Sequence, residues 1–240
     1  MQEVLELIRE RKSARTVFDP KHTVAKQDLK QILEAARWSP TAHNMQNFEI
    51  IVVDDKNLLQ AIGDIKYTIS ETFVKENYQQ LSFSEEELLR KKVGLLGTMF
   101  PPELRTPEAK PDKVTDDKVL SFLGRSIQTS PVVLIVVYDP SKRAPASEGD
   151  FLGIMSLGCV MENMWLVAHS LGIGFHVVSA LSTDPVEKEI KNLLNIPENL
   201  KIAFASRLGY PVSTPTKYLR VRRDMKEFTH YNRFDTKGIE

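Results

Sequence analysis

The longest apolar run in the chain, from Phe151 to Leu171, does most to restrict the possible folds. It is long enough for a membrane-spanning helix, which needs about 20 predominantly apolar residues. The run contains Glu162, Asn163 and His169, however, and ionisable or polar side chains are costly within a bilayer. We therefore predict a long buried helix of a soluble protein, with the other elements packed around it, and no contact with a membrane.

Shorter apolar runs that are rich in β-branched residues predict strands. They lie at 48–53, 132–137, 175–178 and 202–205. Apolar residues at helical spacing, or a proline in the first turn, predict helices. These lie at 2–11, 26–38, 116–127 and 185–194, with further helices between 55 and 100. The alternation of helices with buried strands indicates a mixed α/β or α+β protein built around a sheet.

The composition narrows the class of protein. With 240 residues the chain can form one domain with a sizeable core, or at most two. Lys plus Arg equals Asp plus Glu, 32 against 32, so we expect no chain-wide basic surface for nucleic acid. The single cysteine, Cys159, fits a reducing compartment. Because the N-terminus lacks the basic and apolar regions of a signal peptide, we expect a cytoplasmic protein.

No pattern predicts a metal site or a protein nucleophile. The five histidines show no metal-ligand spacing, and no P-loop or GxSxG motif is present. His169 and His176 fall on a predicted helix and strand, so we expect core histidines with satisfied hydrogen bonds. Cys159 lies among apolar residues and is expected to be an inert packed thiol.

Two basic clusters stand out in this neutral chain. The first is Arg11-Lys12-Ser13-Ala14-Arg15, at the end of the predicted opening helix, and the second comprises Arg220, Arg222 and Arg223. Guanidinium groups bind phosphate in bidentate geometry, and a serine hydroxyl adds one donor. Each cluster is a candidate anion site, although a cluster of this kind in isolation is more often a solvated basic surface.

Two further segments are candidates for ligand binding. The loop from Ser39 to Asn47 is rich in amides and hydroxyls that can recognise the edge of a heterocycle, or that can simply cap a helix-to-strand turn. Gly172-Ile173-Gly174 resembles part of a nucleotide-binding glycine loop. It follows a predicted helix rather than a strand, so we interpret it as a closely packed turn.

Four stretches, in order along the chain, resemble the nitroreductase family of FMN-dependent oxidoreductases. The first basic cluster resembles the family's R-[RH]-S-x-[RK], and the segment 39–48 resembles [AS]-P-[ST]-x-x-N-x-Q-P-W. Leu171 to Gly174 resembles the L-G-[LI]-[GD] that ends the central helix. Leu208 to Pro211, followed by 220–223 and 230–234, resembles the C-terminal signature.

The resemblance implies an architecture. It is an α+β, three-layer fold, with a central mixed or antiparallel sheet flanked by helices, in a single FMN-binding domain over 1–240. An intertwined homodimer would hold two FMN sites at its interface. Residues 66–115 would form a helical and loop cover over the active site, and 212–240 an extended C-terminal arm.

The resemblance also implies a site. Arg11 and Ser13 would bind the FMN phosphate and ribityl chain, Arg15 would face the pyrimidine edge, and Arg220 with Arg222 would complete the phosphate clamp. Backbone N–H groups near Ser179 and Ala180 would reach flavin N5. Pro40, Thr41, Ala42 and Asn44 of the other subunit would cover the ring. The remaining expected FMN-binding residues are Lys12, Gln46, Val178 and Arg223. No protein side chain is expected to be a nucleophile.

The implied activity is NAD(P)H oxidation by a ping-pong cycle that passes electrons to a nitroaromatic, quinone or enone. The alternatives are a flavin-dependent dehalogenase, a flavin-degrading enzyme, or a non-catalytic FMN-binding protein. The chain departs from the family pattern at three places. Asn47-Phe48 replaces Pro-Trp, Ala180 replaces a common glycine, and Asp224 replaces a proline.

Overall fold

In the computed structural model, the described residues are 2–66, 72, 75–99, 124–212 and 219–236. The chain divides into two compact units. Unit 1 comprises Met1–Tyr67 and Ser121–Thr214, and unit 2 comprises Thr68–Leu120 and Pro215–Glu240. The residue ranges of unit 2 are close to the two segments, 66–115 and 212–240, that the family resemblance implies as active-site cover and C-terminal arm.

Unit 1 is built on a four-stranded antiparallel sheet with the order β1-β4-β6-β5. Its strands are β1 (Glu49–Val53), β4 (Val132–Tyr138), β5 (Gly174–Val177) and β6 (Lys201–Gly209). β4 is central and is buried along almost its whole length, as its continuous apolar sequence predicts. β5 forms one edge of the sheet, and this edge carries the candidate site.

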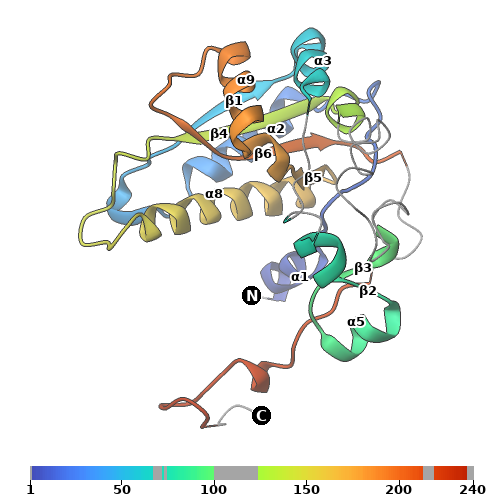
Figure 1. Cartoon of the computed structure of the whole chain (residues 1–240), viewed down its shortest axis with the longest axis vertical. Helices are drawn as coiled ribbons and strands as arrows, with labels where there is room; N and C mark the ends of the chain where they lie inside the picture. The colour runs from blue at the N-terminus through green and yellow to red at the C-terminus, as the bar shows by residue number, and fades with distance from the viewer. Residues whose placement is uncertain (1, 67–71, 73–74, 100–123, 213–218, 237–240) are drawn as a thin grey trace. The chain divides into compact units, whose positions relative to one another are not determined.

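Helices cover both faces of this sheet. α2 (Lys26–Arg37) and α8 (Phe151–Ser170) form one apolar core with the side chains of Val132, Leu134 and Val136. The alternate residues of β4, which are also buried, point to the opposite face, where α3 (Lys56–Asp64) and α9 (Asp184–Leu194) lie (Figure 1). The arrangement of helices, antiparallel sheet and helices confirms the predicted α+β three-layer fold.

α8 is the long helix that the apolar run predicts, but it is buried on one side only. Leu157, Val160 and Met164 face the core, whereas Phe151, at 66% exposure, and Ile154, at 59%, face outward. By length and composition alone α8 could cross a membrane, a test that core helices of soluble proteins also pass. The predicted buried helix is therefore present, but in the single chain only one of its sides is buried.

Close backbone packing secures the N-terminal segment against the sheet. Phe18 is fully buried and pairs with Pro211, and a side chain at Gly174 or Gly209 would collide with its ring. Gly172 has a positive φ of 73°, which glycine adopts without strain. These contacts confirm that Gly172-Ile173-Gly174 is a closely packed turn.

The remaining described elements of unit 1 are short or peripheral. α1 (Gln2–Glu10) precedes the first basic cluster, and η1 (Ala42–Asn44) lies in the polar loop. η5 (Ser179–Ser182) follows β5, and residues 124–128 are helical. Gly63 of α3 approaches the backbone of Gly124 too closely for a side chain at either position.

Unit 2 contains small elements. They are η2 (Lys75–Gln80), β2 (Ser82–Phe83), α5 (Glu85–Lys91), β3 (Leu95–Leu96), η3 (Gly97–Met99) and η6 (Met225–Glu227). β2 and β3 pair in parallel, so the expectation of helices alone between 55 and 100 is wrong. Strands of two residues are too short to show the apolar–polar alternation by which a strand is predicted from sequence. The predicted loop at 101–115 and most of the helix at 116–127 lie outside the described residues.

Candidate functional site

The first basic cluster runs along the free edge of β5. α1 ends at Glu10, and Ser13 then forms a parallel bridge with Phe175. The N–H of Ala14 donates to the carbonyl of Phe175 at 2.9 Å. Because β5 is an edge strand, its outer backbone groups are available for this pairing. The segment is thereby fixed to the sheet rather than solvated like an ordinary basic surface.

α8 holds the start of the same cluster. The Arg11 guanidinium lies 4.2 Å from the centre of the Trp165 ring, and its Nε is 3.1 Å from Oε1 of Glu162. Trp165 Nε1 donates to the carbonyl of Lys12 at 3.0 Å. The Arg11 side chain is 21% exposed. A planar cation stacked on an indole and paired with a carboxylate has a restricted orientation.

A buried arginine lies behind the cluster. Arg207 on β6 is fully buried, and its Nε donates to Nδ1 of His176 at 3.0 Å. Burial lowers the pKa of Arg207 to about 10. Burial, then the charges of Arg207 and Arg15, hold the pKa of His176 well below its usual value. His176 is therefore a neutral core histidine with a satisfied Nδ1, as the sequence predicts.

The polar loop has a constrained backbone. His43, Asn44 and Gln46 all have positive φ values, between 48° and 53°. Residues other than glycine rarely adopt this conformation, and asparagine does so most readily. Thr41 Oγ1 accepts from the N–H of Gln46 at 3.2 Å, and the Gln46 amide donates to Asn44 Oδ1 at 3.2 Å. The loop's amides and hydroxyls thus bond to one another.

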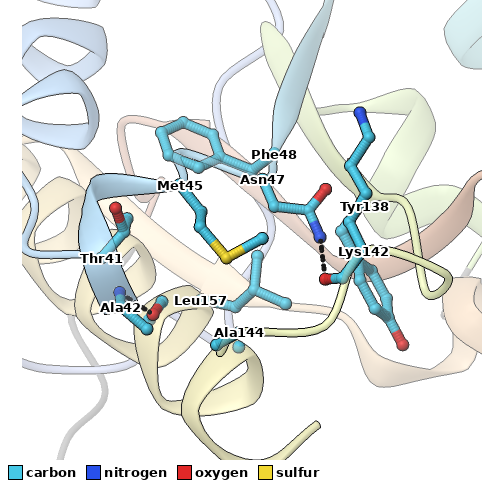
Figure 2. A pocket seen from close by; sticks show the side chains of 11 residues that line it. Thr41, Ala42, Met45, Asn47, Phe48, Tyr138, Lys142, Ala144 and Leu157 are labelled. Carbon is cyan, nitrogen blue, oxygen red and sulfur yellow. Dashed lines mark hydrogen bonds between the residues drawn. The ribbon is translucent and has the colours of Figure 1, made fainter. Parts of the chain in front are cut away.

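The loop is also tied to its surroundings (Figure 2). The N–H of Ala42 donates to Ser156 Oγ of α8 at 2.9 Å. The Asn47 amide donates to the carbonyls of Asp139 at 2.9 Å and Lys142 at 3.2 Å, and its Oδ1 accepts from the N–H of Asp139. Asn47 is one of the departures from the family pattern, and it fastens the loop to the chain that follows β4. Proline could not form these side-chain bonds.

A small pocket lies between this loop and α8. Met45, Phe48, Tyr138, Lys142 and Leu157 line it, together with Thr41, Ala42, Asn47, Ala144, Gly153 and Ser156 (Figure 2). Its interior volume is about 20 Å³, enough for roughly one water molecule. Pro40 is exposed beside the loop, and Asn44 and Gln46 are also exposed. Within the described residues of a single chain, the pocket at this loop is therefore far too small for a flavin.

The predicted N5 donors follow the same edge strand. Val178 is buried after β5, and Ser179 and Ala180 begin η5. The first N–H groups of a helix have no acceptor within it, so these two groups are suited to an external acceptor. The Ala180 side chain is partly exposed, so the departure from glycine leaves the segment's short helix intact.

The second basic cluster belongs to unit 2. Arg220, Arg222 and Arg223 are exposed. Nη1 of Arg222 donates to the carbonyl of Val221 at 2.7 Å, and the Arg223 guanidinium lies 5.5 Å from the ring centre of Phe228. Directly after the cluster, Asp224 Oδ2 is 2.6 Å from Lys92 Nζ. The hydrogen bond with Asp224 raises the pKa of Lys92, and the same contact lowers the pKa of Asp224.

Two sets of predicted residues therefore lie at one strand edge. The cluster 11–15 lies along β5 and the segment 178–180 follows it directly. The polar loop contacts α8 at Ser156, about 13 Å along that helix from Trp165, which Arg11 contacts. The second cluster belongs to a separate unit. Sequence reasoning missed Arg207, Glu162 and Lys92, which hold the two clusters. A charged residue inside the apolar run after Ile202 was the only signal for Arg207.

Comparison with known proteins identifies the family. The sequence profile described as the nitroreductase family matches residues 8–210, which is most of the chain. The chain belongs to the nitroreductase family. A relative from Archaeoglobus fulgidus, provisionally named an NADH dehydrogenase/NAD(P)H nitroreductase, is 23% identical over 211 residues, covering 88% of this chain and 87% of the relative.

Solved structures share the fold. A nitroreductase with bound FMN from Bacteroides fragilis has a TM-score of 0.58 and 22% identity, with 94% of this chain and 97% of that chain covered. Iodotyrosine deiodinase bound to FMN and 3-iodo-L-tyrosine has a TM-score of 0.61 and 22% identity, covering 96% and 100%. Family membership supports an oxidoreductase function, and at these identities the structures show the fold alone.

Proposed function

We propose that the protein is an FMN-dependent NAD(P)H oxidoreductase. The observation that carries the proposal is the fixed position of Arg11, Ser13 and Arg15 along the edge of β5, the strand that leads into Ser179 and Ala180. Cations and a hydroxyl suit a phosphate, and free N–H groups suit a ring nitrogen. The donor set therefore fits the two ends of FMN.

The phosphate end requires several cations, because this group carries close to two negative charges. We assign Arg11 and Ser13 to the phosphate and ribityl chain, with Arg220 and Arg222 completing the clamp. Lys12 and Arg223 would add positive charge to this clamp. Arg11 is paired with Glu162, so phosphate binding would share or exchange this partner.

The ring end requires few protein groups. Hydride transfer to and from the ring is the chemistry that FMN supplies when bound, so no protein nucleophile is needed. Arg15 at the pyrimidine edge would stabilise the negative charge of the reduced ring and raise the reduction potential. The N–H groups of Ser179 and Ala180, which follow the buried residue Val178 in the chain, would donate to flavin N5.

A homodimer would complete the site. The exposed apolar side of α8, formed by Phe151, Ile154 and Met155, matches the kind of surface that obligate interfaces cover. The polar loop lies beside the same helix, so Pro40, Thr41, Ala42, Asn44 and Gln46 of one subunit could cover the ring bound to the other. In this proposal the chain is a single cytoplasmic domain, 66–115 covers the active site, and 212–240 forms the arm.

The proposed cycle is ping-pong. NAD(P)H would reduce the flavin and leave, and a nitroaromatic, quinone or enone would take the electrons. The deiodinase of similar fold makes reductive dehalogenation the second candidate. Product analysis after anaerobic turnover with a nitroarene, a quinone and an iodophenol would separate the two.

Rapid-mixing kinetics test the proposal. FMN-loaded protein should lose its visible flavin absorption on anaerobic mixing with NADH or NADPH, and it should regain this absorption on mixing with an acceptor. A flavin that binds but is reduced no faster than free FMN would indicate a non-catalytic FMN-binding protein. It would thereby reject the enzymatic part of the proposal.

A further inference from the structure

Arg207 connects the sheet to backbone carbonyls of the two residues that flank Arg15, Ala14 and Thr16. It lies opposite His176 in the β5–β6 register and reaches past the edge strand. Nη2 donates to the carbonyl of Ala14 at 3.1 Å and to the carbonyl of Thr16. Nη1 donates to the carbonyl of Ser126 at 3.1 Å, and the guanidinium stacks on Phe18 at 4.4 Å.

The hydrogen-bond partners of this buried cation in the described part of the chain are uncharged. They are three carbonyl oxygens and Nδ1 of His176. Burying a charge is costly unless its hydrogen bonds are satisfied, so a fully buried arginine without a carboxylate partner is unusual. Methionine or leucine could fill the same space without that cost, so we look for a role beyond packing.

Several backbone carbonyls in and next to the first cluster are hydrogen-bonded within the protein. The carbonyl of Lys12 accepts from Trp165, that of Ser13 accepts from the N–H of Arg15 at 3.0 Å, and those of Ala14 and Thr16 accept from Arg207. A carbonyl oxygen is the negative end of a strong dipole. Carbonyls that are bonded to Arg207 do not oppose an anion outside, and Arg15 lies between the two residues whose carbonyls are held in this way.

We propose that Arg207 is a positioning residue, which fixes Arg15 against the negatively charged edge of reduced FMN by clamping the carbonyls of Ala14 and Thr16. This inference rests on the proposed function, since it takes the placement of Arg15 at the pyrimidine edge from there. Preorganised charge is effective because little reorganisation accompanies the change in the ligand's charge. Lysine at 207 would keep the positive charge but lose the planar fork that reaches several acceptors.

A double-mutant cycle on the FMN-loaded protein tests the role. Arg207→Lys should lower the flavin reduction potential, because reduced FMN loses about tenfold in affinity relative to oxidised FMN, or about 30 mV for two electrons. In an Arg15→Gln background, Arg207→Lys should leave the potential unchanged. Ser206→Ala is the matched control, since Ser206 is equally buried and its Oγ has no hydrogen-bond partner among the described residues.

The outcomes are distinguishable. An unchanged flavin reduction potential in Arg207→Lys would overturn the positioning role, and so would an equal drop in potential with and without Arg15→Gln. Neither result would affect the proposed function as long as the parent protein binds FMN. Failure of the parent protein to bind FMN would reject the proposed function first. Should Arg207→Lys not fold, hydrogen exchange on the parent apoprotein decides. The Arg15 amide should be protected as well as the amides of β5, and free exchange there overturns the clamp.

Discussion

The two basic clusters are held in different ways. The backbone of the first is fixed by the sheet edge, by Trp165 and by Arg207, and its Arg11 side chain is largely covered. The second cluster is exposed, and a lysine–carboxylate contact on the surface of unit 2 follows it directly. The same residue type is therefore partly covered and ordered by the fold at one end of the chain and exposed at the other.

The difference bears on how each cluster would bind phosphate. Side chains and backbone that are already ordered lose little freedom when a ligand binds, whereas exposed side chains lose more. We therefore expect the first cluster to give more binding free energy per arginine than the second.

Removal of a phosphate-binding arginine should have the largest effect. Arg11→Ala and Arg222→Ala should each weaken FMN binding by about 1–3 kcal/mol, with Arg11→Ala at the upper end, because a charged hydrogen-bond partner is lost. Fluorescence titration of the apoprotein measures both. Riboflavin, which lacks the phosphate, serves as control and should bind each variant about equally well. Unchanged FMN affinity in both variants would reject the clamp, and a larger effect at Arg222 would reverse the ranking.

The pH dependence of stability should also differ between the regions. The pKa of His176 is lowered in the folded protein, so below about pH 6.5 the unfolded chain binds more protons than the folded one. The free energy of unfolding should therefore fall as the pH drops below 6.5, by at most about 1.4 kcal/mol per pH unit. Asp224 also has a lowered pKa, but for a carboxylate the stabilisation persists until the pH falls below 3.8.

Denaturant unfolding between pH 7 and pH 5 measures the first of these effects. His176→Asn keeps an acceptor for Arg207 and should flatten the pH dependence, whereas Asp224→Asn should leave it as it is in the parent protein over this range. An equally steep loss of stability in His176→Asn would show that another group titrates.

The contact between Lys92 and Asp224 should have the smallest effect. Lys92→Met leaves the Asp224 carboxylate beside the arginines without this partner, so FMN binding should weaken about two- to fivefold, as expected for a surface pair. The double variant Lys92→Met with Asp224→Asn should recover most of the loss. Lys91→Met is the neighbouring control. A loss as large as that of Arg11→Ala would contradict the view that the second cluster is loosely held.

The sequence predicted the elements with continuous apolar patterns and missed those that depend on distant partners. β4 and α8 follow directly from their apolar runs. The apolar run predicts a strand over 202–205 only, whereas β6 begins at Lys201 and continues through Ser206 and Arg207 to Gly209. The acceptors of Arg207 come from residues 14, 16, 126 and 176, and no local pattern reveals such a set.

The same distinction applies to the site. Motif order pointed to the first cluster and to the segment after β5, which the fold brings to one strand edge. Glu162 appeared in the sequence only as a charge in an apolar run, whereas in the structure it pairs with Arg11. Pairing across elements depends on the fold, so residue types alone could not show it.

The central claim, that this chain binds FMN through its phosphate, is tested most directly by titrating the purified apoprotein with FMN and with riboflavin. We predict one FMN per chain, a shifted visible flavin spectrum, and affinity for FMN at least about tenfold higher than for riboflavin, as expected for charged hydrogen bonds to the phosphate. A protein that binds neither flavin, or both equally well, would contradict it.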